Sequence, residues 1–191
     1  MNIIEEAKQF FYSTIPEDAP ITLKAHLEGF GSTLGYVLIS LENSSVINEE
    51  LVRAGMWLHD CGHYPLENEV DHAIRGEDRA RSFLKNQGYN AILTEDVCHC
   101  VRAHRNNDVK PTTPEAKLIA GCDSLTHLIF APYVDMVRIG LETGVKSSAL
   151  EKLERDWRDI CSFLPKDLTI QFSPHYRTWK NWIELRESGS N

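Results

Sequence analysis

Apolar residues recur along the chain at helical rather than alternating spacing, and turn residues separate the apolar segments. No segment shows the strict alternation that is typical of a half-buried strand. The pattern predicts an all-α fold, a single-domain helical bundle. Its helices are expected over Ile3–Ser13, Thr22–Leu41, Asn48 to the HDCGHYP segment at 59–65, Val70–Gln87, Thr94–His104, Thr113 through Asp123, Ser148 through Cys161, and from Ser173 onward.

Capping residues mark several helix ends. Asn48 and Thr94 each precede two acidic residues, which favours an N-cap at both positions. Thr113 followed by Pro114 predicts another helix start, because proline suits the first helical position. Gly88 follows the fourth predicted helix and is expected to take the left-handed conformation that ends many helices.

Two more helix starts are predicted in the C-terminal part of the chain. Ser148 and Glu151 have the spacing of a capping box. Ser173 followed by Pro174 predicts the start of the last helix. The aromatic residues of this part are expected to bury core or the surface of a homodimer.

The length of 191 residues favours one domain with a sizeable core. A hydrophobic fraction of 42% and a charged fraction of 25% are ordinary for a soluble globular protein. We expect a motif-bearing core at about 22–130 and C-terminal helices at about 131–186 that pack on it.

The formal net charge of −8 argues against sequence-independent binding of nucleic acid, because such a surface repels a polyanion. A small phosphorylated substrate stays compatible with this charge, since it needs only local cations or a metal. The chain begins with acids rather than a basic signal-peptide region and has no apolar stretch long enough for a bilayer, which predicts a cytoplasmic protein without membrane contact. Its five cysteines are expected to be thiols.

The adjacent pair His59-Asp60 follows an apolar helix, and the turn at Cys61-Gly62 leaves an open side for a cation. HDCGHYP resembles the signature of the HD superfamily, whose order is an early His, the His-Asp pair and a later Asp. His26 and Asp123 supply the early His and the later Asp. The segments DHAIRGEDRARSFL, VCHCVRAHR and PEAKLIAGCDSLTHL resemble further family motifs, so the similarity covers roughly Lys24–Leu128.

The resemblance implies a metal-dependent hydrolase with Asp60 at its catalytic centre. His72 and His104 occupy the places of the two extra histidines found in members with two metals. A dinuclear site would then hold one ion with His26, His59 and Asp123 and the other with His72 and His104, Asp60 bridging them. The implied cofactor is two ions of a divalent transition metal, with Fe, Mn, Ni, Co or Zn as candidates and Mg as the non-transition alternative, and a hydroxide between the ions would be the nucleophile.

Two alternatives concern the ligands near the second ion. His99 and His104 are five residues apart and cannot share a helix face, so only one of them can point inward. Cys100 lies four residues before His104 and could form a zinc pair with it.

The family's last motif often reads Asp-Ala-Asp, whereas this chain has Gly121 in place of the first acid.

Substrate contacts are predicted for residues near the metal ligands. Arg75 and Arg79 follow His72 at helical spacing and could hold phosphate oxygens, although a solvated face is the competing interpretation. His63 lies in the turn and is either a turn cap or a pocket residue. His127 shares a helix face with Asp123 and either touches substrate or packs behind it.

The leading functional hypothesis is hydrolysis of a small phosphate ester or a nucleotide, because metal ions and cationic side chains suit attack at phosphorus. One alternative is a di-iron oxygenase, since a few HD relatives with the same ligands activate dioxygen. The other alternative is a non-catalytic, regulatory metal-binding module.

Overall fold

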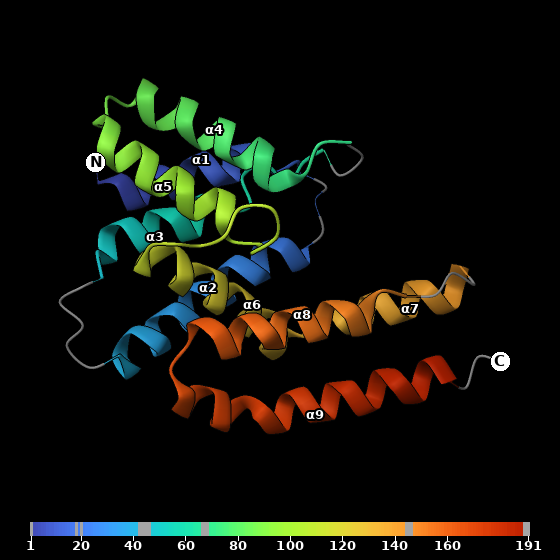
Figure 1. Ribbon diagram of the computed structural model, residues 1–191. Helices are drawn as coiled ribbons and strands as arrows, with labels where there is room; N and C mark the ends of the chain where they lie inside the picture. Colours follow the sequence, from blue (N-terminus) through green and yellow to red (C-terminus); the bar gives the residue numbers. More distant parts are fainter. Residues whose placement is uncertain are drawn as a thin grey trace. The chain divides into compact units, whose positions relative to one another are not determined.

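The computed structural model describes residues 2–17, 19, 21–41, 47–65, 69–143 and 147–188. Within these ranges the regular structure is helical and contains no strand, which confirms the predicted all-α fold. None of the described helices is long and apolar enough to cross a membrane. The helices are α1 (Ile3–Thr14), α2 (Ile21–Ser40), α3 (Glu49–Leu58), α4 (His72–Asn86), α5 (Ala91–Ala103), α6 (Pro114–Phe130), α7 (Tyr133–Thr143), α8 (Ala149–Phe163) and α9 (Lys166–Ser188) (Figure 1).

The chain divides into two compact units, Met1–Ala120 and Gly121–Asn191, and the boundary falls inside α6. Each unit contains fully buried apolar side chains, for example Phe11 and Leu84 in the first and Leu153 and Ile183 in the second. Burying one such side chain contributes about 1.5–3 kcal/mol. That the whole chain is a single domain with its C-terminal helices packed on the core stays a prediction.

The first unit is built around α3, which packs against α1, α2 and α5, while α4 lies along α5 (Figure 1). Phe30 of α2 and Leu58 of α3 are completely buried. Gly55 lets these helices pack closely, because a Cβ atom there would lie 2.6 Å from Cδ1 of Ile119 and 3.3 Å from Cβ of Cys100. This packing holds the C-terminal end of α3, from which the His-Asp pair follows.

In the second unit α8 and α9 lie side by side and antiparallel, and α7 packs against both (Figure 1). The buried residues of α8 include Leu153, Asp156 and Ile160, which recur at helical spacing on one face. The indole N–H of Trp179 donates to the carbonyl oxygen of Leu128 at 3.1 Å and so ties α9 to the end of α6.

The structure confirms three of the predicted helix ends. The side chain of Asn48 accepts a hydrogen bond from the backbone N–H of Leu51, and that of Thr113 accepts one from Ala116, both at 3.2 Å. Gly88 has a φ of 81°, the left-handed conformation expected after α4. Local capping chemistry therefore decides these ends.

Two other predicted starts are wrong. Helix α5 begins at Ala91, because the side chain of Asn90 accepts from the backbone N–H of Leu93 at 2.9 Å. Thr94 is buried inside the helix, where its hydroxyl donates to the carbonyl oxygen of Asn90 at 2.9 Å. Helix α4 begins at His72 rather than Val70, since Asp71 caps it through the N–H of Ala73.

The two C-terminal starts also need correction. Ser148 is the N-cap of α8 but makes no side-chain capping bond, so the predicted capping box does not form. Helix α9 begins at Lys166 and contains Pro174 in its interior, so Ser173 does not open it. Proline cannot donate to the carbonyl oxygen four residues earlier, and the Ser173 hydroxyl donates to that oxygen, on Ile170, at 3.0 Å instead.

Candidate metal centre

The turn after α3 presses directly against the start of α4. A Cβ atom at Gly62 would lie 2.2 Å from the carbonyl oxygen of His72 and 2.3 Å from the backbone nitrogen of Gly76. Gly76 is close-packed as well, because a Cβ atom there would lie 3.2 Å from Cγ1 of Val101. Because Gly62 and Gly76 have no side chain, the backbone of the His-Asp turn packs directly against the backbone of the first turns of α4.

Two arginines of α4 hold the carbonyl oxygens of this turn. Arg75 donates from Nε to Gly62 at 3.0 Å and from Nη2 to His63 at 3.2 Å and Pro65 at 3.0 Å. Arg79 donates from Nη1 to Cys61 at 2.8 Å. Both side chains therefore position the turn, and the substrate contact predicted for them stays a prediction.

Five imidazole rings lie in a row in the first unit. Neighbouring ring centroids are 5.8, 5.0, 5.3 and 5.5 Å apart in the order His26, His59, His104, His72, His63. The rings come from α2, the C-terminal ends of α3 and α5, the start of α4 and the turn after α3. Packing of four helices therefore gathers histidines that are far apart in the sequence.

Backbone carbonyls orient the two buried histidines at the helix ends. Nδ1 of His59 lies 2.7 Å from the carbonyl oxygen of Met56, and Nδ1 of His104 lies 2.6 Å from that of Val101. A carbonyl oxygen only accepts, so each Nδ1 carries the proton and each Nε2 carries the lone pair. Such partners are typical of histidines that bind metal through the other ring nitrogen.

Asp71 is the acidic neighbour of Nδ1 of His72, beyond hydrogen-bond distance. Its Oδ1 lies 3.7 Å from Nδ1 of His72, and its other oxygen pairs with the guanidinium of Arg105. Although burial opposes it, the N–H of Ala73 and Arg105 hold the pKa of Asp71 below its ordinary value. The sequence interpretation missed Asp71, although it is a charged residue directly beside a predicted ligand.

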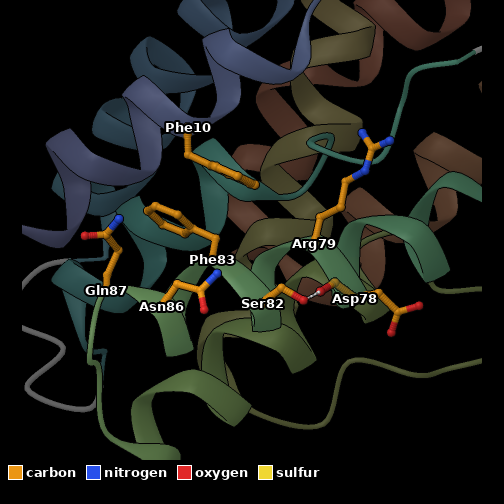
Figure 2. Close-up of a pocket in the computed structure, with 7 residues that line it drawn as sticks. All are labelled: Phe10, Asp78, Arg79, Ser82, Phe83, Asn86 and Gln87. Atoms are coloured by element: carbon orange, nitrogen blue, oxygen red, sulfur yellow. Dashed lines mark hydrogen bonds between the residues drawn. The ribbon is translucent and has the colours of Figure 1, made fainter.

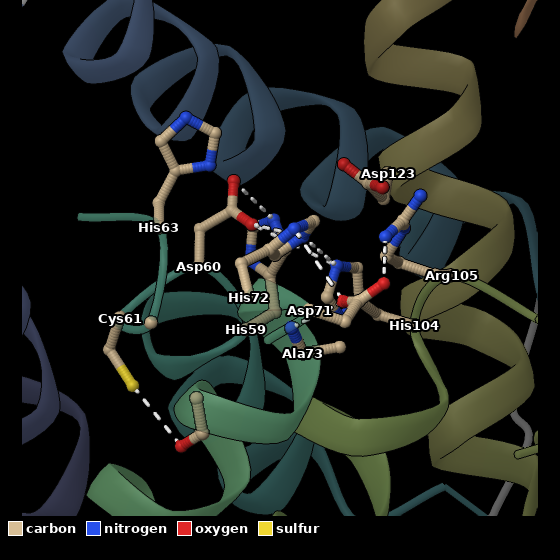
Figure 3. A network of polar contacts seen from close by, with 12 residues as sticks. His59, Asp60, Cys61, His63, Asp71, His72, Ala73, His104, Arg105 and Asp123 are labelled. Carbon is tan, nitrogen blue, oxygen red and sulfur yellow. Dashed lines mark hydrogen bonds and ion pairs between the residues drawn. The ribbon is translucent and has the colours of Figure 1, made fainter. Parts of the chain in front are cut away.

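Asp60 lies at the centre of these rings (Figure 3). Its carboxylate oxygens lie 3.4 Å from Nε2 of His59, 3.5 Å from Nε2 of His72 and 3.8 Å from Nε2 of His104. Burial alone would raise the pKa of Asp60, but the imidazoles around it hold that pKa well below its usual range. Asp60 is therefore an anion among nitrogen donors.

The surroundings of His72 favour its neutral imidazole. Burial, aided by the positive charge of Arg105, lowers the pKa of His72. A neutral imidazole can offer a lone pair to a cation, whereas a protonated one cannot. Nε2 of His72 lies 3.3 Å from Nε2 of His104, so the two nitrogens converge on one point.

The donors form two overlapping triads around Asp60. Asp60, His63 and His72 each offer an atom within 4.8 Å of the others. Asp60, His72 and His104 are equally close, with separations of 3.5, 3.3 and 3.8 Å. Mixed imidazole and carboxylate donors at these separations fit a divalent transition-metal ion.

His99 and Cys100, the two alternative ligands considered for the second ion, have other contacts. Nε2 of His99 accepts from the backbone N–H of Thr112 at 3.1 Å, so His99 is engaged with the segment before α6. Cys100 is a buried thiol packed under Gly55, and burial raises its pKa. Burial also raises the pKa of Cys61 and of Cys98 to about 12, which favours the protonated thiol at both positions.

Asp123 and His127 belong to the second unit, where they form part of a polar cluster between α6, α7 and α8. Nε2 of His127 lies 3.7 Å from Oδ1 of Asp123, and its Nδ1 lies 3.5 Å from Oδ2 of Asp156. Asp156 also pairs with Lys152 at 3.2 Å and accepts from the hydroxyl of Tyr133 at 2.8 Å. The cluster holds the imidazole of His127 between two carboxylates.

Gly121, which stands where the family's last motif often has its first aspartate, packs tightly against other residues of the second unit. A Cβ atom at Gly121 would lie 2.7 Å from Cδ2 and 2.8 Å from Cγ of Leu164, and 3.2 Å from Cβ of Phe163. Any side chain at this position would collide with the end of α8. An aspartate here would therefore require Leu164 to move.

A surface groove of about 490 Å³ lies between α1 and α4 (Figure 2). Phe10 and Phe83 stack in it with ring centroids 4.3 Å apart. The other lining residues are Asp78, Arg79, Ser82, Asn86 and Gln87. This lining holds one carboxylate and no imidazole or thiol, so the groove lacks the donors of a metal site.

The first unit thus defines a helical protein with a preorganised cluster of imidazoles around one carboxylate, of the kind that binds divalent metal ions. The sequence profile of the HD domain family matches residues 24–128, and the chain belongs to this family. Members of the family bind divalent metals and are largely hydrolases. No curated protein and no solved structure matches the chain.

Proposed function

We propose that the protein is a metal-dependent phosphohydrolase that acts on a small phosphate ester or a nucleotide. The observation that carries this proposal is the ionised Asp60 carboxylate amid the Nε2 atoms of His59, His72 and His104. The proposed ligands are His26, His59 and Asp123 for one ion and His72 and His104 for the other, with Asp60 shared between them. When bound, the ions supply Lewis acidity toward a phosphoryl group and an activated water.

The protein's own residues preorganise this site. The carbonyl oxygens of Met56 and Val101 orient His59 and His104, and Arg75 and Arg79 hold the turn that carries Asp60. We assign the two arginines a positioning role, because a substrate phosphate would have to compete with carbonyl oxygens at 2.8–3.2 Å. The net charge of −8 favours a small substrate over a polyanion.

The test combines metal analysis of protein purified without chelators with turnover of a panel of phosphate monoesters, diesters and nucleotides. Bound transition metal and metal-dependent release of phosphate or a nucleoside monophosphate are expected. Two bound irons with substrate-dependent consumption of dioxygen and no phosphate release would replace the hydrolase with an oxygenase. Tight metal binding without either reaction would indicate a binding module.

Replacing Asp71 with asparagine should weaken metal binding at His72 by about 10-fold, a typical cost of losing an outer partner of a ligating histidine. Asparagine keeps the N-cap of α4 but removes the negative charge that faces His72 and Arg105. Titration of the metal-free protein with Mn²⁺ or Co²⁺ measures the affinity. Asp108→Asn is the matched control, because it removes the exposed partner of Arg102, and equal affinities for the two variants would contradict the prediction.

A further inference from the structure

His63 lies on the opposite side of His72 from His104. Its ring centroid is 5.5 Å from that of His72, and it offers a nitrogen within 4.8 Å of donor atoms from both Asp60 and His72 (Figure 3). The sequence predicts a substrate contact for His63. The structure places its imidazole within a group of residues that can hold a metal ion.

Contacts of the backbone fix the position of His63. The N–H of His63 donates to the carbonyl oxygen of Asp60 at 2.9 Å, which closes a tight turn. Gly62 packs against α4 so closely that no side chain fits, and Arg75 binds the carbonyl oxygens of Gly62 and His63, which belong to the peptides on either side of the His63 Cα atom. A backbone held this firmly is preorganised to present the His63 side chain to a ligand, since little backbone freedom remains to be lost on binding.

One nitrogen of His63 lacks a protein partner. Among the described residues, Nδ1 of His63 is buried and makes no hydrogen bond. A buried polar atom is nearly always satisfied by protein, water or an ion. The carboxylate of Asp60 and the imidazole of His72 are the neighbouring donors to such an ion.

We propose that His63 is a protein ligand of the second metal ion, together with Asp60 and His72. The inference rests on the proposed metal binding of this site and adds an imidazole that the predicted ligand set does not contain. Further nitrogen donors at this ion favour a transition metal such as Zn²⁺, Fe²⁺ or Co²⁺ over Mg²⁺, which prefers oxygen. The site would thereby be selective for its metal through the turn residue His63.

The experiment measures metal binding in the absence of any substrate, because a substrate contact and a metal ligand differ there. Metal-free parent protein, His63→Ala and His63→Gln are titrated with Co²⁺ by calorimetry, and the visible absorption of the bound ion is recorded. The parent should bind two ions. Both variants should bind the second ion at least about 10-fold more weakly and change its spectrum, since a lost ligand costs no less than a lost outer partner.

His99→Ala is the matched control, because His99 is a histidine of the same unit that bonds Thr112 instead. It should bind both ions as the parent does. Binding of two ions by His63→Ala or His63→Gln with parental affinity and spectrum, or of one ion only by the parent, would overturn the proposal. Weakened second-ion binding in a protein that hydrolyses no phosphate ester would leave the ligand assignment in place and remove the proposed function.

Discussion

Replacing Asp60 with alanine should abolish phosphate-ester hydrolysis and most metal binding while leaving the helical fold largely intact. Asp60 belongs to both donor triads, with His63 and His72 in one and with His72 and His104 in the other. Without the shared carboxylate, neither ion retains an anionic ligand from the first unit's cluster. The measurements are turnover of the best substrate, metal stoichiometry and circular dichroism.

The expected loss of stability for Asp60→Ala is about 1–3 kcal/mol, because the surrounding imidazoles lose a charged partner. Asp96→Ala provides the control, since Asp96 is an exposed carboxylate on α5 of the same unit, and its activity should equal that of the parent. Full activity in folded Asp60→Ala protein would show that the chemistry lies elsewhere.

The helix ends show which structural features local sequence patterns can predict. Asn48, Thr113 and Gly88 decide their helix ends through contacts with the nearest residues, which a sequence pattern contains. Thr94 has an equally good capping pattern. The cap is nevertheless Asn90, four residues earlier, whose side chain accepts from the N–H of Leu93, and Thr94 is buried inside the helix. The choice between two competing caps depends on which of them the core covers, and that is not a local property.

The turn between α6 and α7 was not predictable from turn chemistry. Ala131 adopts a φ of 52°, a conformation that alanine rarely takes and that sequence interpretation assigns to glycine or asparagine. No glycine or asparagine marks this corner, and the separate helix α7 therefore had no specific prediction. Tertiary packing, including the buried Tyr133, outweighs the local preference here.

The candidate site, like the helix ends, has a part that the sequence predicts and a part that it does not. The order of histidines and aspartates along the chain predicted which residues gather in the first unit, because each motif lies on or beside a separate helix. The carbonyl oxygens that orient His59 and His104 lie three residues earlier in the same helices, whereas the arginine contacts were not predictable, since they join side chains of α4 to backbone atoms of another segment. Arg75 and Arg79 were predicted either to contact a phosphate or to lie on a solvated face, and neither interpretation contained their bonds to carbonyl oxygens of the turn 61–65.

Replacing Gly62 with alanine should lower the free energy of unfolding by about 3 kcal/mol or more, at the upper end of the cost of overpacking. The added Cβ would lie 2.2 Å from the carbonyl oxygen of His72 and 2.8 Å from Cα of Gly76, and backbone atoms cannot swing away as a flexible side chain can. The turn or α4 must shift. In a chain of this length the loss corresponds to a decrease in Tm of about 2–4 °C per kcal/mol.

Gly35→Ala is the control for Gly62→Ala, because Gly35 lies inside α2 of the same unit and a Cβ atom there meets nothing within 4 Å. Alanine at position 35 should raise stability by up to about 1 kcal/mol through helix propensity. The two glycine variants thus differ in sign, and thermal and denaturant unfolding measure both. The shift at position 62 should also weaken metal binding, since it separates His63 and Asp60 from His72. If Gly62→Ala were as stable as Gly35→Ala and bound metal like the parent, the close contact between the turn and α4 would not be what holds the site together.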